Sequence, residues 1–532
     1  MTVLPPSATN ERPTEYAERL GRAYAEALPP EQRKAQGLYL TPSAVARFMA
    51  AQLQMRGEHL RLLDPAAGSG VLIAAAIEAL ALRKLRPTSI EVVAYEIDHG
   101  LLPHLRAVLS FAEAWARDHG LSVSTRVKCG DFVLEHASAL QALGGFLPAF
   151  AEPFDAVIAN PPYFKIAKDD PRARAALSVV HGQPNIYGLF MAVTAALLKP
   201  NGAFVYITPR SFASGPYFRL FRERFFDLIQ PKTVHVFNSR RDAFSRDDVL
   251  QENIIFVGER SDHWHRKPSD VSVTISTSHG TRDLDQPEIQ KMPLSSLLDM
   301  DSADKVLRIP ASENDASVLS LVDGWPRLLS HFGMGISTGP VVPFRAREHL
   351  EEAGDILVDH APMLWMNHVQ PMSTHWPNGA RRPQYIKLTA LERGLLVPNK
   401  NYVLLRRFSA KEEKRRLTAA PYLANQYATP FVGLENHLNY IHRPGGSLTE
   451  PEAWGLAALY SSRLLDTYFR AINGNTQVSA TELRIMPLPE YTVIEDIGRR
   501  ACGIDDPDVL DELVMDAIAQ PNRKRVKAVA HA

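Results

Sequence analysis

The stretch FDAVIANPPYFKI, residues 154–166, decides the fold of this chain. Its apolar half, residues 155–159, predicts a buried β-strand. Pro161 and Pro162 then fix φ and remove two backbone donors, so the strand must end there in a rigid elbow. Ligands bind at the carboxyl ends of strands in open α/β sheets. Asn160 beside Tyr163 at such an end suits a site for a flat aromatic amine; the alternative is a proline-rich turn with a buried tyrosine.

Upstream of this elbow lies a second ligand-binding pattern. A short apolar strand over residues 60–63 leads into Asp64-Pro-Ala-Ala-Gly68-Ser-Gly70 and then into an Ala- and Leu-rich helix over residues 71–85. Strand, glycine turn and helix form the nucleotide-binding opening of a doubly wound sheet. Glycine is needed where the backbone bends sharply and lies close to a ligand, and amides at the helix start favour an anion. The same turn could serve packing alone.

Two further strands are expected to end in acidic side chains. Residues 90–98 end in Glu96 and Asp98, roughly thirty residues beyond the glycines, where such folds place the acid that binds ribose hydroxyls. For Asp98 a solvated strand end is an equally good interpretation. A strand over residues 124–128 leads into Gly130-Asp131-Phe132, where a carboxylate and a ring can accept from an adenine amino group and flank the base. The pattern favours a nucleoside site.

The strands and helices expected in the rest of the chain indicate where the domains begin and end. Strands are expected at residues 203–208, 233–238 and 253–259, and the last two could pair as an antiparallel edge. We therefore predict an α/β fold, with a Rossmann-like domain of about seven strands over residues 37–260. An N-terminal extension and helix (1–36) precede it, and a polar linker or subdomain (261–330) follows. Short β-rich segments and helices over residues 331–520 predict a mixed α+β domain, ending in a basic tail (521–532).

Composition excludes several classes of protein. The chain has 532 residues with formal net charge +0, so any nucleic-acid contact must come from local basic clusters. Such clusters, otherwise solvated faces, occur at Arg381, Arg382, Lys400, Arg406, Arg407 and residues 411–416. Only Cys129 and Cys502 occur, without metal-ligand spacing, which argues against a zinc site or disulfide scaffold. No apolar run of eighteen residues and no signal core is present, so we expect a soluble, cytoplasmic protein without a membrane span.

Taken in order, three motifs identify a family. They are Gly37-Leu-Tyr-Leu-Thr41-Pro42, Asp64-Pro-Ala-Ala-Gly68-Ser-Gly70 and Asn160-Pro-Pro-Tyr163. The chain resembles the S-adenosylmethionine-dependent DNA adenine-N6 methyltransferases in the gamma arrangement, the group that includes the TaqI methylase. The resemblance covers residues 37 to about 260 and, more loosely, a target-recognition DNA-binding domain over 331–520. Length and general style also resemble an XhoI-type modification methylase, with target CTCGAG.

The resemblance implies roles for individual residues, with S-adenosyl-L-methionine as cofactor and no metal. Tyr39, Thr41 and Pro42 would lie by the methionine part of the cofactor, and Asp64, Ala66, Gly68 and Gly70 would hold its amino-acid moiety. Glu96 would bind the ribose, and Asp131 and Phe132 the adenine. Asn160, Pro161, Pro162 and Tyr163 would be catalytic, and Tyr163 and Phe244 would stack on the target base.

The chemistry supports this assignment. An adenine amino group is a poor nucleophile because its lone pair is delocalised into the ring. If Asn160 Oδ1 and the Pro161 carbonyl accept its two N–H bonds, the lone pair can aim at a methyl carbon, and alignment is the main requirement. A base in a duplex must first leave the helix.

The expected partners are double-stranded DNA and a cognate restriction endonuclease that is linked in function but not necessarily bound. The alternatives are an RNA adenine methylase, a protein-glutamine methylase, since N-P-P-Y also fits a carboxamide, and a bifunctional restriction nuclease-methylase. About 36 residues precede the first motif, which is too few for a nuclease domain.

Overall fold

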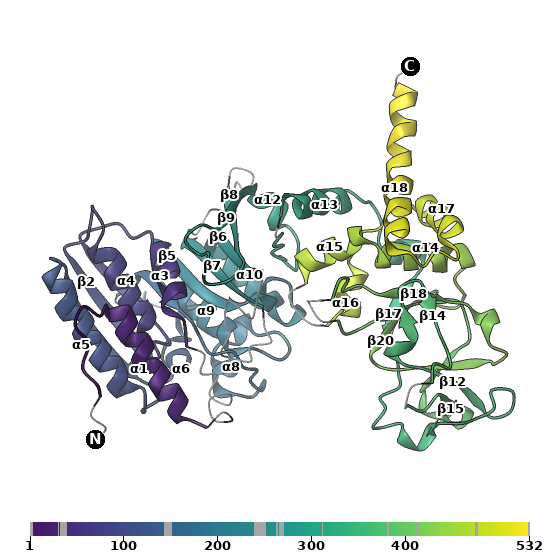
Figure 1. The fold of residues 1–532 in the computed structure, drawn as a ribbon, viewed down its shortest axis with the longest axis horizontal. Helices are drawn as coiled ribbons and strands as arrows, with labels where there is room; N and C mark the ends of the chain where they lie inside the picture. The colour runs from purple at the N-terminus through teal and green to yellow at the C-terminus, as the bar shows by residue number, and fades with distance from the viewer. Residues whose placement is uncertain are drawn as a thin grey trace. The chain divides into compact units, whose positions relative to one another are not determined.

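The computed structural model describes residues 4–29, 31, 40–142, 152–238, 252–261, 264, 271–310, 312–379, 382–409, 413–473 and 477–529. The chain divides into two compact units, Met1–Ala311 and Ser312–Ala532. Figure 1 shows the elements of both. Each unit has its own hydrophobic core, so each is described by itself.

The first unit is built on one nine-stranded sheet with the order β3-β2-β1-β4-β5-β7-β6-β8-β9. Its strands are β1 (His59–Asp64), β2 (Ser89–Glu96), β3 (Ser122–Cys129), β4 (Phe154–Ala159), β5 (Leu198–Pro209), β6 (Ile229–Phe237), β7 (Asn253–Arg260), β8 (Ser272–Ser278) and β9 (Glu288–Pro293). Neighbouring strands pair in parallel along the run β3-β2-β1-β4-β5. Strand β7 lies between β5 and β6 and is antiparallel to both. The strand order reverses between β1 and β4, which places a ligand crevice at their carboxyl ends.

Helices cover both faces of this sheet (Figure 1). They are α1 (Pro13–Ala27), α3 (Ser43–Ala51), α4 (Val71–Ala81), α5 (Leu102–Asp118), α6 (Phe132–His136), α7 (Ala139–Ala142), α8 (Pro171–Ala175), α9 (Ile186–Leu197), α10 (Arg219–Leu228) and α12 (Leu294–Leu297). Strand β5 shows why two layers form, because successive side chains point to opposite faces. Val205 and Ile207 join the core under α1, α3, α4 and α5. Phe204 instead packs against Phe225 of α10, on the other face.

The sheet is longer than the predicted seven strands. Strand β8 pairs in parallel with β6, and β9 pairs antiparallel with β8. The segment predicted as a linker or subdomain, residues 261–330, therefore contributes two strands to the first unit, which ends at Ala311. Strand β9 is an exposed edge with mostly polar side chains, so it carries little of the apolar signal by which strands are recognised. The pair β6–β7 is antiparallel as expected, but it lies inside the sheet.

The second unit combines small sheets with a helical layer. A four-stranded sheet has the order β10-β20-β17-β18, and a five-stranded sheet the order β11-β15-β12-β19-β16. The strands are β10 (Gly335–Thr338), β11 (Leu350–Glu351), β12 (His360–Leu364), β13 (Val369–Gln370), β14 (Ser373–Thr374), β15 (Tyr385–Lys387), β16 (Leu396–Pro398), β17 (Tyr402–Arg406), β18 (Ala419–Tyr422), β19 (Phe431–Leu434) and β20 (Leu438–His442). The helices are α13 (Glu313–Asp323), α14 (Glu450–Ser461), α15 (Arg463–Ile472), α16 (Ala480–Arg484), α17 (Tyr491–Ala501) and α18 (Pro507–Val529).

Part of the predicted basic surface of this unit is internal. Arg416 is 3% exposed, bonds to Asn473 Oδ1 at 3.1 Å and lies over the Phe469 ring. Arg415 pairs with Asp511 at 2.7 Å. These two arginines stabilise the unit and are not open phosphate contacts, because their charges are already paired or packed. Within the described residues, no helix has the length and apolar character needed to span a membrane.

Candidate active site

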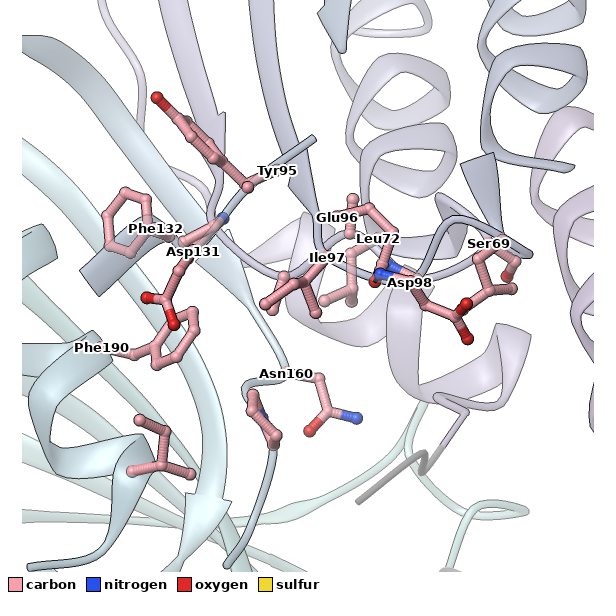
Figure 2. Close-up of a pocket in the computed structure, with 18 of the residues that line it drawn as sticks. Ser69, Leu72, Tyr95, Glu96, Ile97, Asp98, Asp131, Phe132, Asn160 and Phe190 are labelled. Atoms are coloured by element: carbon pink, nitrogen blue, oxygen red, sulfur yellow. Dashed lines mark hydrogen bonds between the residues drawn. The ribbon is translucent and has the colours of Figure 1, made fainter. Parts of the chain in front are cut away.

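A cavity of about 510 Å³ opens at the carboxyl ends of β1 to β4. Figure 2 shows Glu96, Ile97 and Asp98 on one side of it, Asp131, Phe132 and Phe190 on the other, and Asn160 between them. Pockets of this size suit a ligand of the dimensions of a nucleoside derivative. The lining residues are Leu40, Thr41, Pro65, Ala66, Ala67, Gly68, Ser69, Val71, Leu72, Tyr95, Glu96, Ile97, Asp98, His99, Leu101, Gly130, Asp131, Phe132, Asn160, Pro162, Phe164, Arg172, Ile186 and Phe190.

The glycine turn after β1 forms one wall. Gly68 has a φ of +55°, and a Cβ built there would have no atom of the described residues within 4 Å. The backbone at Gly68 therefore faces open space and can lie against a ligand. Gly70 (φ +89°) has a packing role instead, because a Cβ there would meet Leu105 Cδ1 at 2.9 Å.

Glu96 ties the end of β2 to this turn. Its Oε2 accepts from the Gly68 N–H at 2.8 Å, and its Oε1 accepts from the Asp98 N–H at 2.8 Å. Burial raises the pKa of Glu96, and the nearby Asp98 acts in the same direction. Each carboxylate oxygen has two lone pairs, so Glu96 can still accept from hydroxyl groups in the cavity.

Asp64, at the end of β1, is completely buried. Its Oδ1 accepts from the Ala66 N–H at 3.1 Å, whereas its Oδ2 has no hydrogen-bond partner in the described part of the chain. Burial raises the pKa of Asp64 to about 8. A buried carboxyl oxygen of this kind is costly unless a ligand or proton satisfies it.

The opposite wall holds an aromatic layer and a further carboxylate. The Phe132 ring is 1% exposed and stacks on Phe190 of α9, with ring centroids 5.5 Å apart. Asp131 caps α6 by accepting from the Leu134 N–H at 3.0 Å. Its Oδ2 lies 3.8 Å from Nη1 of Arg172, which comes from α8 and also lines the cavity. A flat ring bound here would meet apolar faces and one acceptor.

Asn160 stands at the elbow after β4. Its Nδ2 donates to Thr41 Oγ1 at 2.9 Å, and its Oδ1 accepts from the Tyr163 hydroxyl. Tyr163 is 7% exposed and its hydroxyl also reaches the Ile207 carbonyl at 3.0 Å. The tyrosine ring lies behind the cavity wall, whereas the amide of Asn160 lines the cavity.

The structure thus brings most of the predicted site residues to one cavity. Thr41, Ala66, Gly68, Glu96, Asp131, Phe132, Asn160 and Pro162 line it, while Pro42, Asp64, Gly70, Pro161 and Tyr163 adjoin lining residues in the chain. Tyr39 and Phe244 lie outside the described residues. Sequence reasoning missed Phe164, Arg172 and Phe190. They carry no motif. Phe164 and Arg172 follow Asn160 closely in the chain, which was their only signal, and Phe190 of α9 had none.

Comparisons with known proteins identify relatives of this chain. A family model described as Eco57I restriction-modification methylase matches residues 123–244. The type II methyltransferase M.PstI of Providencia stuartii is 34% identical over 486 residues, which cover 91% of this chain and 92% of that protein. M.BsuBI of Bacillus subtilis is 31% identical over 468 residues, 87% of this chain and 89% of the relative. The DrdV–DNA complex aligns with a TM-score of 0.48 at 14% identity, covering 92% of this chain and 60% of that one.

The first unit is an α/β domain whose sheet has a parallel half and carries the glycine turn described above. The chain belongs to the family of type II methyltransferases that includes M.PstI and M.BsuBI. The match to these relatives spans both units, so the family likeness is not confined to the sheet domain.

Proposed function

We propose that this chain is a site-specific DNA adenine-N6 methyltransferase of the N-P-P-Y type. It would transfer a methyl group from S-adenosylmethionine to an adenine turned out of a short duplex sequence, as the modification half of a type II restriction-modification system. The observation that carries the proposal is the Asn160 amide at the elbow after β4, in the same cavity as Glu96 and Asp131. Restriction-modification relatives that match nearly the whole chain support the DNA substrate.

The cavity fits the cofactor. The open space before Gly68 accepts a ligand against the backbone, and the orphaned Asp64 Oδ2 suits the cationic amino group of an amino acid. Glu96 would accept from ribose hydroxyls, and Asp131, Phe132 and Phe190 would hold the adenine. When bound, S-adenosylmethionine supplies a methyl group already activated by its positive sulfur.

The chain's own residues then have to orient the target amine. Asn160 Oδ1 and the Pro161 carbonyl would accept its two N–H bonds, which draws the nitrogen towards tetrahedral geometry and frees its lone pair for attack. The N–C bond would form as the S–C bond breaks, and the amine would then lose one proton to water. Pro161 and Pro162 fix the backbone of the elbow, so little conformational entropy has to be lost when the reacting groups align.

Finer assignments rest on the sequence resemblance and remain predictions. These are the gamma arrangement and the XhoI-type target CTCGAG. The stacking role of Tyr163 requires its ring to leave the buried position that it has here. A cognate restriction endonuclease is expected as a functional partner.

The test is to express the chain alone in a bacterium without DNA methylases and to sequence its genomic DNA by a single-molecule method that detects modified bases. Asn160→Ala, expressed to the same level, is the matched control. One short motif methylated at adenine only with the unchanged chain supports the proposal, and CTCGAG would support the XhoI-type assignment. DNA that stays unmodified, although the purified chain binds the cofactor, would contradict it. RNA or a protein amide would then be tested as substrate.

A further inference from the structure

Thr41, Asn160, Tyr163 and Ile207 form a continuous hydrogen-bond chain beside the cavity. Asn160 Nδ2 donates to Thr41 Oγ1 at 2.9 Å, the Tyr163 hydroxyl donates to Asn160 Oδ1, and the same hydroxyl lies 3.0 Å from the Ile207 carbonyl. Thr41 is 4% exposed and lies just before α3, whose Val45 and Met49 are buried in the core. The hydroxyl of Thr41 is therefore held in place by a packed helix.

This chain can run in two directions. A side-chain amide has an oxygen and a nitrogen of almost the same size, so its orientation is set by its partners. Both neighbouring hydroxyls can donate or accept. If Tyr163 donates to the Ile207 carbonyl instead, its oxygen can accept from Asn160 Nδ2, and the amide oxygen then turns to Thr41. In that reversed state Asn160 offers its nitrogen where the target amine needs an acceptor.

Thr41 can decide between these states because it also lines the cavity. When its O–H points into the cavity and donates to an acceptor there, its oxygen can only accept, so Asn160 Nδ2 must face it. The cofactor's carboxylate is such an acceptor. We propose that Thr41 is a positioning residue that couples occupation of the cofactor cavity to the orientation of the Asn160 amide. This inference rests on the proposed function of the site and assigns Thr41 an action through Asn160.

The experiment compares the full chain with Thr41→Val, which removes the hydroxyl at nearly constant shape, and with Thr41→Ser, which keeps it. The first readout is the NMR signal of the Asn160 side-chain NH₂ in ¹⁵N-asparagine-labelled protein, assigned with Asn160→Asp. It is recorded without ligand and at saturating S-adenosylhomocysteine, which carries the same carboxylate but no transferable methyl group. The second readout is the single-turnover rate at saturating S-adenosylmethionine on unmethylated bacterial genomic DNA. Cofactor affinity is measured by calorimetry.

We expect ligand addition to shift the Asn160 signal alike in the unchanged chain and in Thr41→Ser. In Thr41→Val the shift should be smaller, because only the direct effect of a ligand in the cavity that Asn160 lines remains. Thr41→Val should bind the cofactor about tenfold more weakly, because the hydroxyl that donates to the charged carboxylate is lost. At saturating cofactor it should still methylate about tenfold more slowly, as for one lost hydrogen bond that positions the Asn160 amide. An equal shift in Thr41→Val, an unchanged rate, or a rate deficit that disappears with more cofactor would each overturn the inference. If the unchanged chain methylates no DNA, the proposed function fails, while the NMR comparison still decides the role of Thr41.

Discussion

Asn160 is the single side chain on which the proposed chemistry depends most. Asn160→Ala removes the acceptor for the target amine but leaves Glu96, Asp64 and Asp131 in place. We expect the methylation rate to fall by at least about a hundredfold, as when one polar contact to the reacting group is removed from an active site. Cofactor affinity by calorimetry should change little. The control is Asn314→Ala, at an exposed position of the second unit; retained turnover in Asn160→Ala would refute the role of the amide.

Glu96 should act on binding and not on the chemical step. Its two oxygens already accept from the Gly68 and Asp98 N–H groups, so Glu96→Ala removes the proposed ribose acceptor and also loosens the turn. We expect the dissociation constant of the cofactor to rise by about tenfold to a hundredfold, as for hydrogen bonds to a charged group. The dissociation constant of Glu96→Gln should lie between those of the unchanged chain and Glu96→Ala. Calorimetry beside the exposed Glu58→Ala control measures this, and equal affinity in all variants would exclude the ribose contact.

Asp64 makes the cofactor-free protein sensitive to pH. Its pKa is about 8 in the folded chain, against about 4 for an ordinary carboxyl, so the folded state holds a proton that the unfolded state has lost between these values. The contribution of Asp64 to stability should therefore decrease as the pH rises from about 4 to about 8. Asn at this position does not titrate. We expect the Tm of Asp64→Asn relative to the unchanged chain to be higher at pH 8 than at pH 5, and a constant difference would contradict the raised pKa.

At the scale of elements, helix α1 is fastened to α4, the helix that follows the glycine turn. Glu78 of α4 is 3% exposed and accepts from both the N–H and the hydroxyl of Thr14, each at 2.7 Å. Glu78→Ala leaves two buried donors without this acceptor, so we expect a loss of about 1–3 kcal/mol in unfolding free energy. Glu18→Ala removes only the surface pair with Arg22 and should cost less than about 0.5 kcal/mol. Thermal unfolding of both variants tests this. An equal loss of unfolding free energy in the two would argue against a stabilising role of the Glu78–Thr14 hydrogen bonds.

Some elements that form the site could be predicted from the sequence, and others could not. Strand ends that carry Asp64, Glu96, Asp131 and Asn160 were predictable because apolar runs and the residues just after them are local features, and parallel strands bring their carboxyl ends to one edge. Phe190 was not, because its ring reaches the cavity from α9, whose side chains are nearly all buried and apolar and so carry no distinguishing pattern. Strands β8 and β9 were missed for the opposite reason, since most of their side chains are polar: β9 is the edge of the sheet, and β8, although it lies inside the sheet, has only Val273 and Ile275 as apolar residues.

At the scale of the whole molecule, a formal net charge of +0 means that DNA affinity must come from local groups of open cations. We propose that cations of the second unit supply it. The structure separates two kinds of basic residue there. Arg416 is buried against Asn473 and Phe469 and stabilises the fold. Lys400 lies partly exposed just before β17, and we expect it to contact a phosphate.

These two residues therefore predict opposite outcomes. Lys400→Ala should weaken binding to duplex DNA of any sequence and reduce the slope of log affinity against log salt concentration by about one, with Tm unchanged. Arg416→Ala should lower Tm, because it removes the buried bond to Asn473 and the contact with the Phe469 ring, and its salt slope should stay that of the unchanged chain. Fluorescence anisotropy on a labelled duplex at several salt concentrations measures the slopes. A reduced slope in Arg416→Ala alone would mean that the buried arginine turns outward to meet DNA, and that the described packing of the second unit is not its DNA-bound state.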